Sequence, residues 1–243
     1  MRLLAAVSAV FVIGSACSLL LGLELVNAPT VYGNWPGGVT RRELASAVMG
    51  GFRTCAAQST AAPAGCPQAV DGPVSVSWKL AGDPLQGAGY EMMGASGTDR
   101  QFQVWGTYAM VATSTTGGGG AYAANGPYIA SVLWTQGSLH LSDIRDGGFQ
   151  VPRPSTLTDG AARQALASAL GTCGRAPSQA LCPDGTPQRG SIDQASIRWD
   201  GVTGVLHLQG AFASSAGRIS YDALIVKGLA GAPVCYYVGY SSS

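Results

Sequence analysis

The chain has 243 residues, of which 11% are charged, and its formal net charge is +1. This charged fraction is far below the roughly 25% of ordinary soluble domains. With so little net charge, the composition excludes a surface built to attract nucleic acid or a strongly acidic partner. The 35 glycines and the 47% of hydrophobic residues favour short strands joined by many turns.

The N-terminus carries an uncharged apolar run, Leu3 to Leu23, of 21 residues. About 20 apolar residues are enough for a helix to cross a bilayer. Arg2 precedes the run, which predicts a cytoplasmic N-terminus and an extracytoplasmic remainder. We therefore expect residues 1–25 to be a transmembrane anchor or an uncleaved signal. The alternatives are a cleaved signal peptide and a lipoprotein acylated at Cys17.

Residues 26–39 are predicted to be a juxtamembrane linker. This linker contains Tyr32 and Trp35. Aromatic side chains gather where a membrane meets water, so both residues are candidates for the membrane interface. They could equally cap the first sheet, and the sequence does not choose between these positions.

Two helices are predicted, each from an apolar stripe at spacings i, i+3, i+4, i+7, i+8 and i+11. Thr40 and Thr158 precede the stripes and are expected to be N-caps, and Glu43 completes a capping box after Thr40. The stripes are Leu44, Ala47, Val48, Gly51, Phe52 and Cys55 in the first copy, and Ala162, Ala165, Leu166, Ala169, Leu170 and Cys173 in the second.

After each helix come short apolar or alternating segments separated by glycine-rich turns, which predict about four antiparallel strands. The two copies align through Trp78 with Trp199 and through Gly106 with Gly210. We therefore predict an α+β fold: a transmembrane helix, then two tandem modules, each with one helix packed on a curved antiparallel sheet. Module 1 is expected to span residues 40–150 and module 2 residues 158–243, joined by a Pro-rich linker at 151–157.

Five cysteines follow the midpoint of the apolar run, where an extracytoplasmic location allows disulfides. Equivalent positions in the two copies predict the pairs Cys55–Cys66 and Cys173–Cys182. A metal site or a redox pair is the alternative, but the intervals are longer than such sites prefer and no histidine lies near. Cys235 is expected to be an inert buried thiol, with intermolecular pairing as the alternative.

The apolar anchor, the Ala-rich helix that ends in Cys55, the segment APAGCP and the short strands together resemble a known group. The sequence is similar to uncharacterised membrane-anchored envelope proteins of high-GC Gram-positive bacteria with tandem cysteine-stapled modules. The resemblance implies NTF2-like or cystatin-like modules and supplies no catalytic residues.

The sequence offers no residue that can be assigned a catalytic, cofactor-binding or metal-binding role. His140 and His207 both lie within strand patterns beside leucines. On a straight strand, alternation places His140 and Asp143 on opposite faces. The acids are scattered, mostly in turns, at Asp83, Glu91, Asp99, Asp143, Asp146, Asp184, Asp193, Asp200 and Asp222.

We therefore expect a membrane-anchored, extracytoplasmic binding or scaffolding protein of the cell envelope, with no cofactor and no nucleic acid. Its expected partners are the membrane, through the N-terminal helix, and another envelope protein. One alternative is a small-ligand-binding or enzymatic pocket between helix and sheet. The other is a purely structural envelope component.

Overall fold

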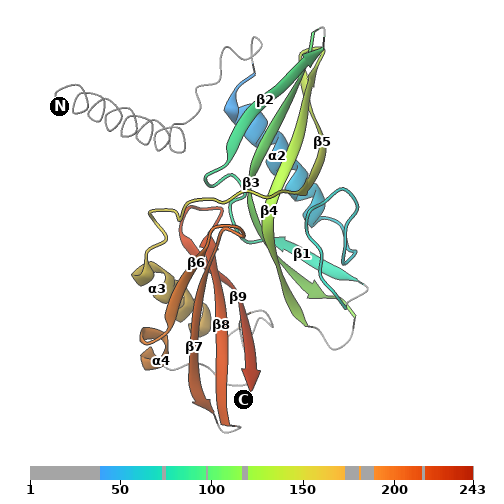
Figure 1. The fold of residues 1–243 in the computed structure, drawn as a ribbon. Coiled ribbons are helices and arrows are strands. Elements are labelled where there is room, and N and C mark those ends of the chain that lie inside the picture. Colours follow the sequence, from blue (N-terminus) through green and yellow to red (C-terminus); the bar gives the residue numbers. More distant parts are fainter. Residues whose placement is uncertain are drawn as a thin grey trace, which may run out of the picture. The chain divides into compact units, whose positions relative to one another are not determined.

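The fold consists of two antiparallel sheets, each with helix packed on one face (Figure 1). A computed structural model describes residues 39–72, 75–96, 98–116, 120–172, 181, 189–214 and 217–242. Of the described residues, 51% lie in strands and 18% in helices.

The first sheet follows helix α2 (Arg41–Ala56) and has the strand order β1-β3-β4-β5. β2 pairs with the first part of β3, beyond the end of β1 on the same edge. Because β3 and β4 are long, they extend past the part of the sheet that α2 covers (Figure 1). The strands are β1 (Val76–Leu80), β2 (Gly89–Ser96), β3 (Asp99–Ser114), β4 (Ala121–Thr135) and β5 (Ser138–Asp146).

The second sheet is a four-stranded meander in the order β6-β7-β8-β9. It follows α3 (Asp159–Gly171) and the short helix α4 (Arg189–Asp193). Ala162, Leu166 and Leu170 of α3 are buried in the core beneath this sheet. The strands are β6 (Ser196–Asp200), β7 (Val205–Ser214), β8 (Gly217–Lys227) and β9 (Pro233–Ser242).

The predicted helix starts are confirmed. The Thr40 hydroxyl accepts from Glu43 N at 3.2 Å, and the Glu43 carboxylate accepts from Thr40 N at 2.7 Å, which completes the capping box. The Thr158 hydroxyl accepts from Ala161 N at 3.2 Å. The buried residues of α2 are five of the six predicted in its stripe: Leu44, Val48, Gly51, Phe52 and Cys55.

In each sheet a strand glycine makes room for a tyrosine of the next strand. Gly106 lies opposite Tyr128, and a Cβ on Gly106 would be 3.0 Å from the Tyr128 ring. Gly210 lies opposite Tyr221, and a Cβ there would be 2.5 Å from the Tyr221 hydroxyl. The Tyr128 ring meets the ring of Phe52 edge-on at 4.9 Å, so this contact joins the sheet to α2.

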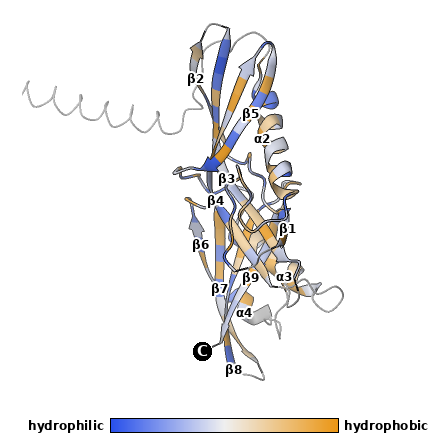
Figure 2. Ribbon diagram, turned by 90° about the vertical axis from the view of Figure 1, so that its right-hand side faces the viewer, coloured by the Kyte–Doolittle hydropathy of each residue, from blue (hydrophilic) through white to orange (hydrophobic). Residues whose placement is uncertain are grey.

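The two sheets meet on the faces turned away from their helices. Ala109 and Val111 of β3 pack in one apolar cluster with Leu224 and Val226 of β8. Figure 2 shows much of this central region in the colours of apolar residues. The contact buries apolar surface that neither helix covers, which favours a fixed arrangement of the two sheets.

Backbone hydrogen bonds continue this contact. Asp83 N donates to Lys227 O at 2.9 Å, and Gly82 and Gly228 form an isolated antiparallel bridge. The Lys227 ammonium donates to the side-chain oxygen of Gln86. The segment after β1 is thus tied to the end of β8 through main chain and side chains together.

The predicted fold class, an α+β fold with one helix on each sheet, is wrong in its share of helix and strand and in its number of helices. The described residues are mostly strand, and their three helices do not divide one to a module, because α4 adds a second helix before the second sheet. The first sheet also contains β2, a strand that the sequence analysis missed. A run rich in glycine and methionine, GYEMMGAS, lacks the alternation that indicates a strand.

Several predictions concern residues outside those described: the transmembrane anchor with Cys17, the interface candidates Tyr32 and Trp35, and the Cys173–Cys182 bond. Among the described residues, no helix is both long and apolar enough to span a bilayer.

The Cys55–Cys66 disulfide is confirmed. Its S–S distance is 2.04 Å, and it links the last turn of α2 to the segment that leads to β1. Gln68 is buried nearby and donates to Cys55 O at 3.2 Å. Cys235 is a buried free thiol, and burial raises its pKa to about 12, which keeps it protonated and unreactive.

Replacing Gly106 with alanine is expected to destabilise the protein, because the new Cβ would lie 2.8 Å from Pro84 O. Overpacking of this kind costs about 1–3 kcal/mol, or a fall in Tm of about 3–10 °C. Gly94→Ala is the matched control, since a Cβ at Gly94 meets nothing within 4 Å. Equal melting temperatures for the two variants, measured by circular dichroism, would contradict the packing argument.

Replacing Cys55 and Cys66 together with alanine is expected to lower the free energy of unfolding by about 2–3 kcal/mol, because the unfolded chain gains freedom. The measurement is the Tm of variant and parent without reductant. A further fall in the variant's Tm on adding reductant would come from the predicted Cys173–Cys182 bond. If variant and parent melt together, the bond does not stabilise the fold.

Candidate functional site

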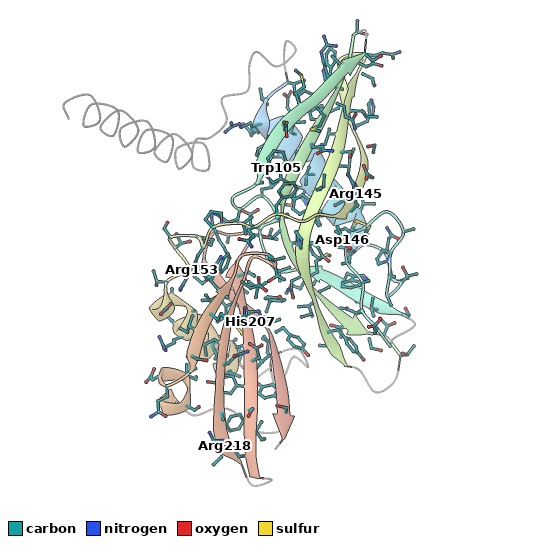
Figure 3. The ribbon with its side chains drawn as sticks, viewed as in Figure 1. Trp105, Arg145, Asp146, Arg153, His207 and Arg218 are labelled. Carbon is teal, nitrogen blue, oxygen red and sulfur yellow. A yellow bond between two sulfur atoms is a disulfide. The ribbon has the colours of Figure 1, made fainter. Side chains whose placement is uncertain are left out.

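The open face of the second sheet, meaning the face turned away from α3, divides into a covered and an uncovered part. Near the first sheet it carries apolar residues, among them Val205 and Leu224, which are buried in the contact between the sheets. Farther along the same strands, alternation places His207, Gln209 and Asp222 on this face. Figure 3 labels His207 on β7 and Arg218 toward the far end of the sheet.

These three polar side chains form one hydrogen-bonded group. His207 Nδ1 lies 2.9 Å from Asp222 Oδ2 and 3.2 Å from Oδ1, and Gln209 Nε2 donates to Oδ2 at 3.1 Å. An ionised carboxylate accepts only, so Nδ1 of His207 carries the proton. The His207 side chain is 15% exposed and that of Asp222 is 36% exposed, so the group is held firmly while its carboxylate still reaches solvent.

Beside this group lies a groove of about 540 Å³ across β7, β8 and β9, which we call the trough. On the open face its lining consists of Gln209, Ser220, Asp222, Gly239 and Ser241. Gly239 is the direct cross-strand neighbour of Asp222. Because Gly239 has no side chain, the β9 side of the Asp222 carboxylate is left uncovered.

The ring of Tyr237 borders the trough on the side of the first sheet. A Cβ on Gly239 would be 3.4 Å from the ring of Tyr237, so this ring stands next to the uncovered position. Burial raises the pKa of Tyr237, and the neighbouring Tyr122 of β4 raises it further. The Tyr237 hydroxyl therefore stays neutral, and its ring supplies an uncharged aromatic border.

Tyr236 fixes the trough to the first sheet. Its hydroxyl donates to Asn125 Oδ1 at 3.0 Å. Burial is the main cause that raises the pKa of Tyr236, and the negative charge of Asp222 contributes, so the hydroxyl keeps its proton. The contact joins β9, which forms one side of the trough, to β4 of the first sheet.

Two other hollows differ from the trough. The space where the sheets meet, around Asp83, Thr107 and Lys227, holds about 20 Å³, which is room for about one water molecule. A second groove of about 540 Å³ runs between α3 and β9, lined by small or apolar side chains such as Ala165 and Val234.

The remaining sequence candidates lie apart from the trough. His140 is exposed on β5 of the first sheet. The expectation that His140 and Asp143 lie on opposite faces is wrong, because a bulge shifts the register between them and both end on the face away from α2. Asp143 instead pairs with Arg145 at 3.6 Å in an exposed contact. In the described part of the chain, no three His, Cys, Asp or Glu side chains gather around a metal position.

The His207–Asp222–Gln209 group was not predicted, although the short connection between β7 and β8 in the sequence indicates it. Strands β7 and β8 pair so that Ser214 lies opposite Gly217, which places Gln209 directly opposite Asp222. Counting back from a tight turn at this hairpin would have brought the acid beside both β7 side chains.

Comparison of the chain with protein-family models, with curated proteins and with solved structures gives no match. The predicted resemblance to envelope proteins of high-GC Gram-positive bacteria therefore stays a prediction, and the functional argument depends on the residues themselves.

Proposed function

We propose that the chain is a membrane-anchored, extracytoplasmic protein of the cell envelope that binds or scaffolds a partner protein without catalysing a reaction. The observation that carries this proposal is the trough: an ordered polar surface with a carboxylate that reaches solvent, on a sheet whose open face is buried against the first sheet around Val205 and Leu224. Recognition surfaces need such preorganised groups on rigid strands.

The Cys55–Cys66 disulfide supports the compartment in this proposal. Disulfides persist outside the cytoplasm and are rare inside it. The uncharged run from Leu3 to Leu23 supports the anchor, since its length matches a bilayer-spanning helix.

The groove between α3 and β9 favours a second candidate function, the binding of a small apolar ligand between helix and sheet. Among the described residues its lining, which includes Ala161, Ala165, Ala169 and Val234, offers apolar contact and no charged group. Bound ligand there would leave the trough free.

The anchor is tested by washing membranes from expressing cells with alkaline carbonate. The full chain is expected to stay in the pellet, because a spanning helix is not extracted. A chain without residues 1–25 is expected in the soluble fraction. Release of the full chain by the wash would contradict the anchor.

The partner is tested by photo-crosslinking in cells, with a benzophenone amino acid in place of Ser220 in the trough. A reproducible adduct with one envelope protein, identified by mass spectrometry, is expected. The matched control places the same amino acid at Gln101, which is exposed on β3 of the first sheet and should not give this adduct.

If both positions return the protein alone at a normal crosslinking yield, the binding proposal fails. The alternatives, a purely structural envelope component or a protein that binds a small ligand, are then favoured.

A further inference from the structure

We infer that the trough recognises an organic cation, an ammonium or guanidinium group, held between the carboxylate of Asp222 and the ring of Tyr237. This inference deepens the proposed function and rests on it, because it names the chemistry that the partner or ligand must present.

The carboxylate of Asp222 is held in place by two donors and can still accept others. Asp222 accepts from His207 and Gln209, two donors that lie on β7 on one side of it. An ionised carboxylate has about four acceptor positions, so it can accept further donors from the side of the trough. The two existing contacts fix its direction, which reduces the entropy that a ligand would lose on binding.

The charge of Asp222 favours a cationic ligand in the trough. In its neutral form His207 is a hydrogen-bond donor to Asp222 and leaves the negative charge in place. The two lysines of the chain are Lys79 and Lys227, and Lys227 is engaged by Gln86 at the other end of β8. Arg218 is four residues from Asp222 along β8, a distance of about 13 Å in an extended strand. Arg198 of β6 lies opposite His207 on the same face but does not line the trough, and Asp222 is the one charged residue among the described residues that do. The trough therefore attracts a cation from outside the chain.

The space at Gly239 and the ring of Tyr237 suit an ammonium or guanidinium group. Gly239 opposite Asp222 leaves space for a head group, and the Tyr237 ring borders that space. A cation over an aromatic face is stabilised by about 0.5–1 kcal/mol at an exposed site. Ser220 and Ser241 line the trough with small hydroxyls that accept from the remaining N–H groups of the cation.

The cation has two possible sources, a free amine or a lysine or arginine side chain of a partner, and the experiment separates them. The full chain, purified in detergent micelles, is titrated by calorimetry at low salt with three probes. These are spermidine, an extended peptide of alternating serine and lysine, and the same peptide with its lysines acetylated. The charged probes should bind, more weakly as salt is raised, and the acetylated peptide should not.

Asp222→Asn preserves the volume of the side chain and removes its charge. It is expected to weaken the charged probe about tenfold or more, because a hydrogen bond to a charged group is lost. Asp99→Asn is the matched control, since Asp99 is exposed on β3 of the first sheet and the charge change is the same. The control should bind as the parent does.

Gly239→Val tests the same site without changing any charge. A Cβ at Gly239 makes only ordinary contacts, so the variant is expected to fold, while its methyl groups fill the space beside Asp222. Loss of binding in both variants, with Tm preserved, supports the inference. Binding of spermidine alone assigns a free amine, and binding of the lysine peptide assigns a side chain of a partner.

Unchanged affinity in Asp222→Asn or in Gly239→Val, equal binding of the acetylated peptide, or no binding of either charged probe overturns the inference. If the Ser220 crosslink still captures its partner in that case, the proposed function stands and only the cation is wrong. If the crosslink is absent as well, both fail.

Discussion

The architecture depends on two strands that are buried on both faces. On β8, Ala223 and Ile225 face the core beneath α3, while Leu224 and Val226 face the first sheet. On β3, Ala109 and Val111 face β8, and Met110 between them is buried on the opposite side. Such segments have no solvated face, so each sheet is incomplete without the other. Charges are excluded along both strands at this level, in keeping with the low charged fraction of the whole chain.

This constraint also determines which surface is free. The contact between the sheets ends near Leu224 and Tyr236, and the open face continues beyond it with His207, Gln209 and Asp222. The trough is therefore built on strands that are held by an apolar core at one end and by the Tyr236–Asn125 hydrogen bond at its side. A polar group on so fixed a base keeps its geometry without a ligand, which is the condition for selective binding at modest cost in entropy.

Local features of this fold could be predicted from the sequence, and features that need strand register could not. The caps at Thr40 and Thr158 and the Cys55–Cys66 bond follow from residues close together in the chain. β2 was missed because its pairing with β3 defines it, while its own residues show no alternation and most of them are exposed. The His207–Asp222 pair was missed because it depends on the register of β7 and β8, and a register shift of one residue would place the two side chains on opposite faces. The predicted match of Gly106 with Gly210 also matches Tyr128 with Tyr221, because each tyrosine lies opposite one of these glycines.

With these residues matched, the two sheets can be compared at the level of the trough. The pairs Gly106–Tyr128 and Gly210–Tyr221 make Trp105 the counterpart of Gln209, and Ile129 that of Asp222. In the first sheet this surface is apolar, and Phe149 from the segment after β5 stacks on Trp105 at 5.4 Å. In the first sheet, the chain thus covers this apolar surface with its own Phe149. The second sheet carries an amide and a carboxylate at the same positions, which no apolar segment could cover without loss of hydration. The difference between the copies thus favours a polar, cationic occupant for the trough.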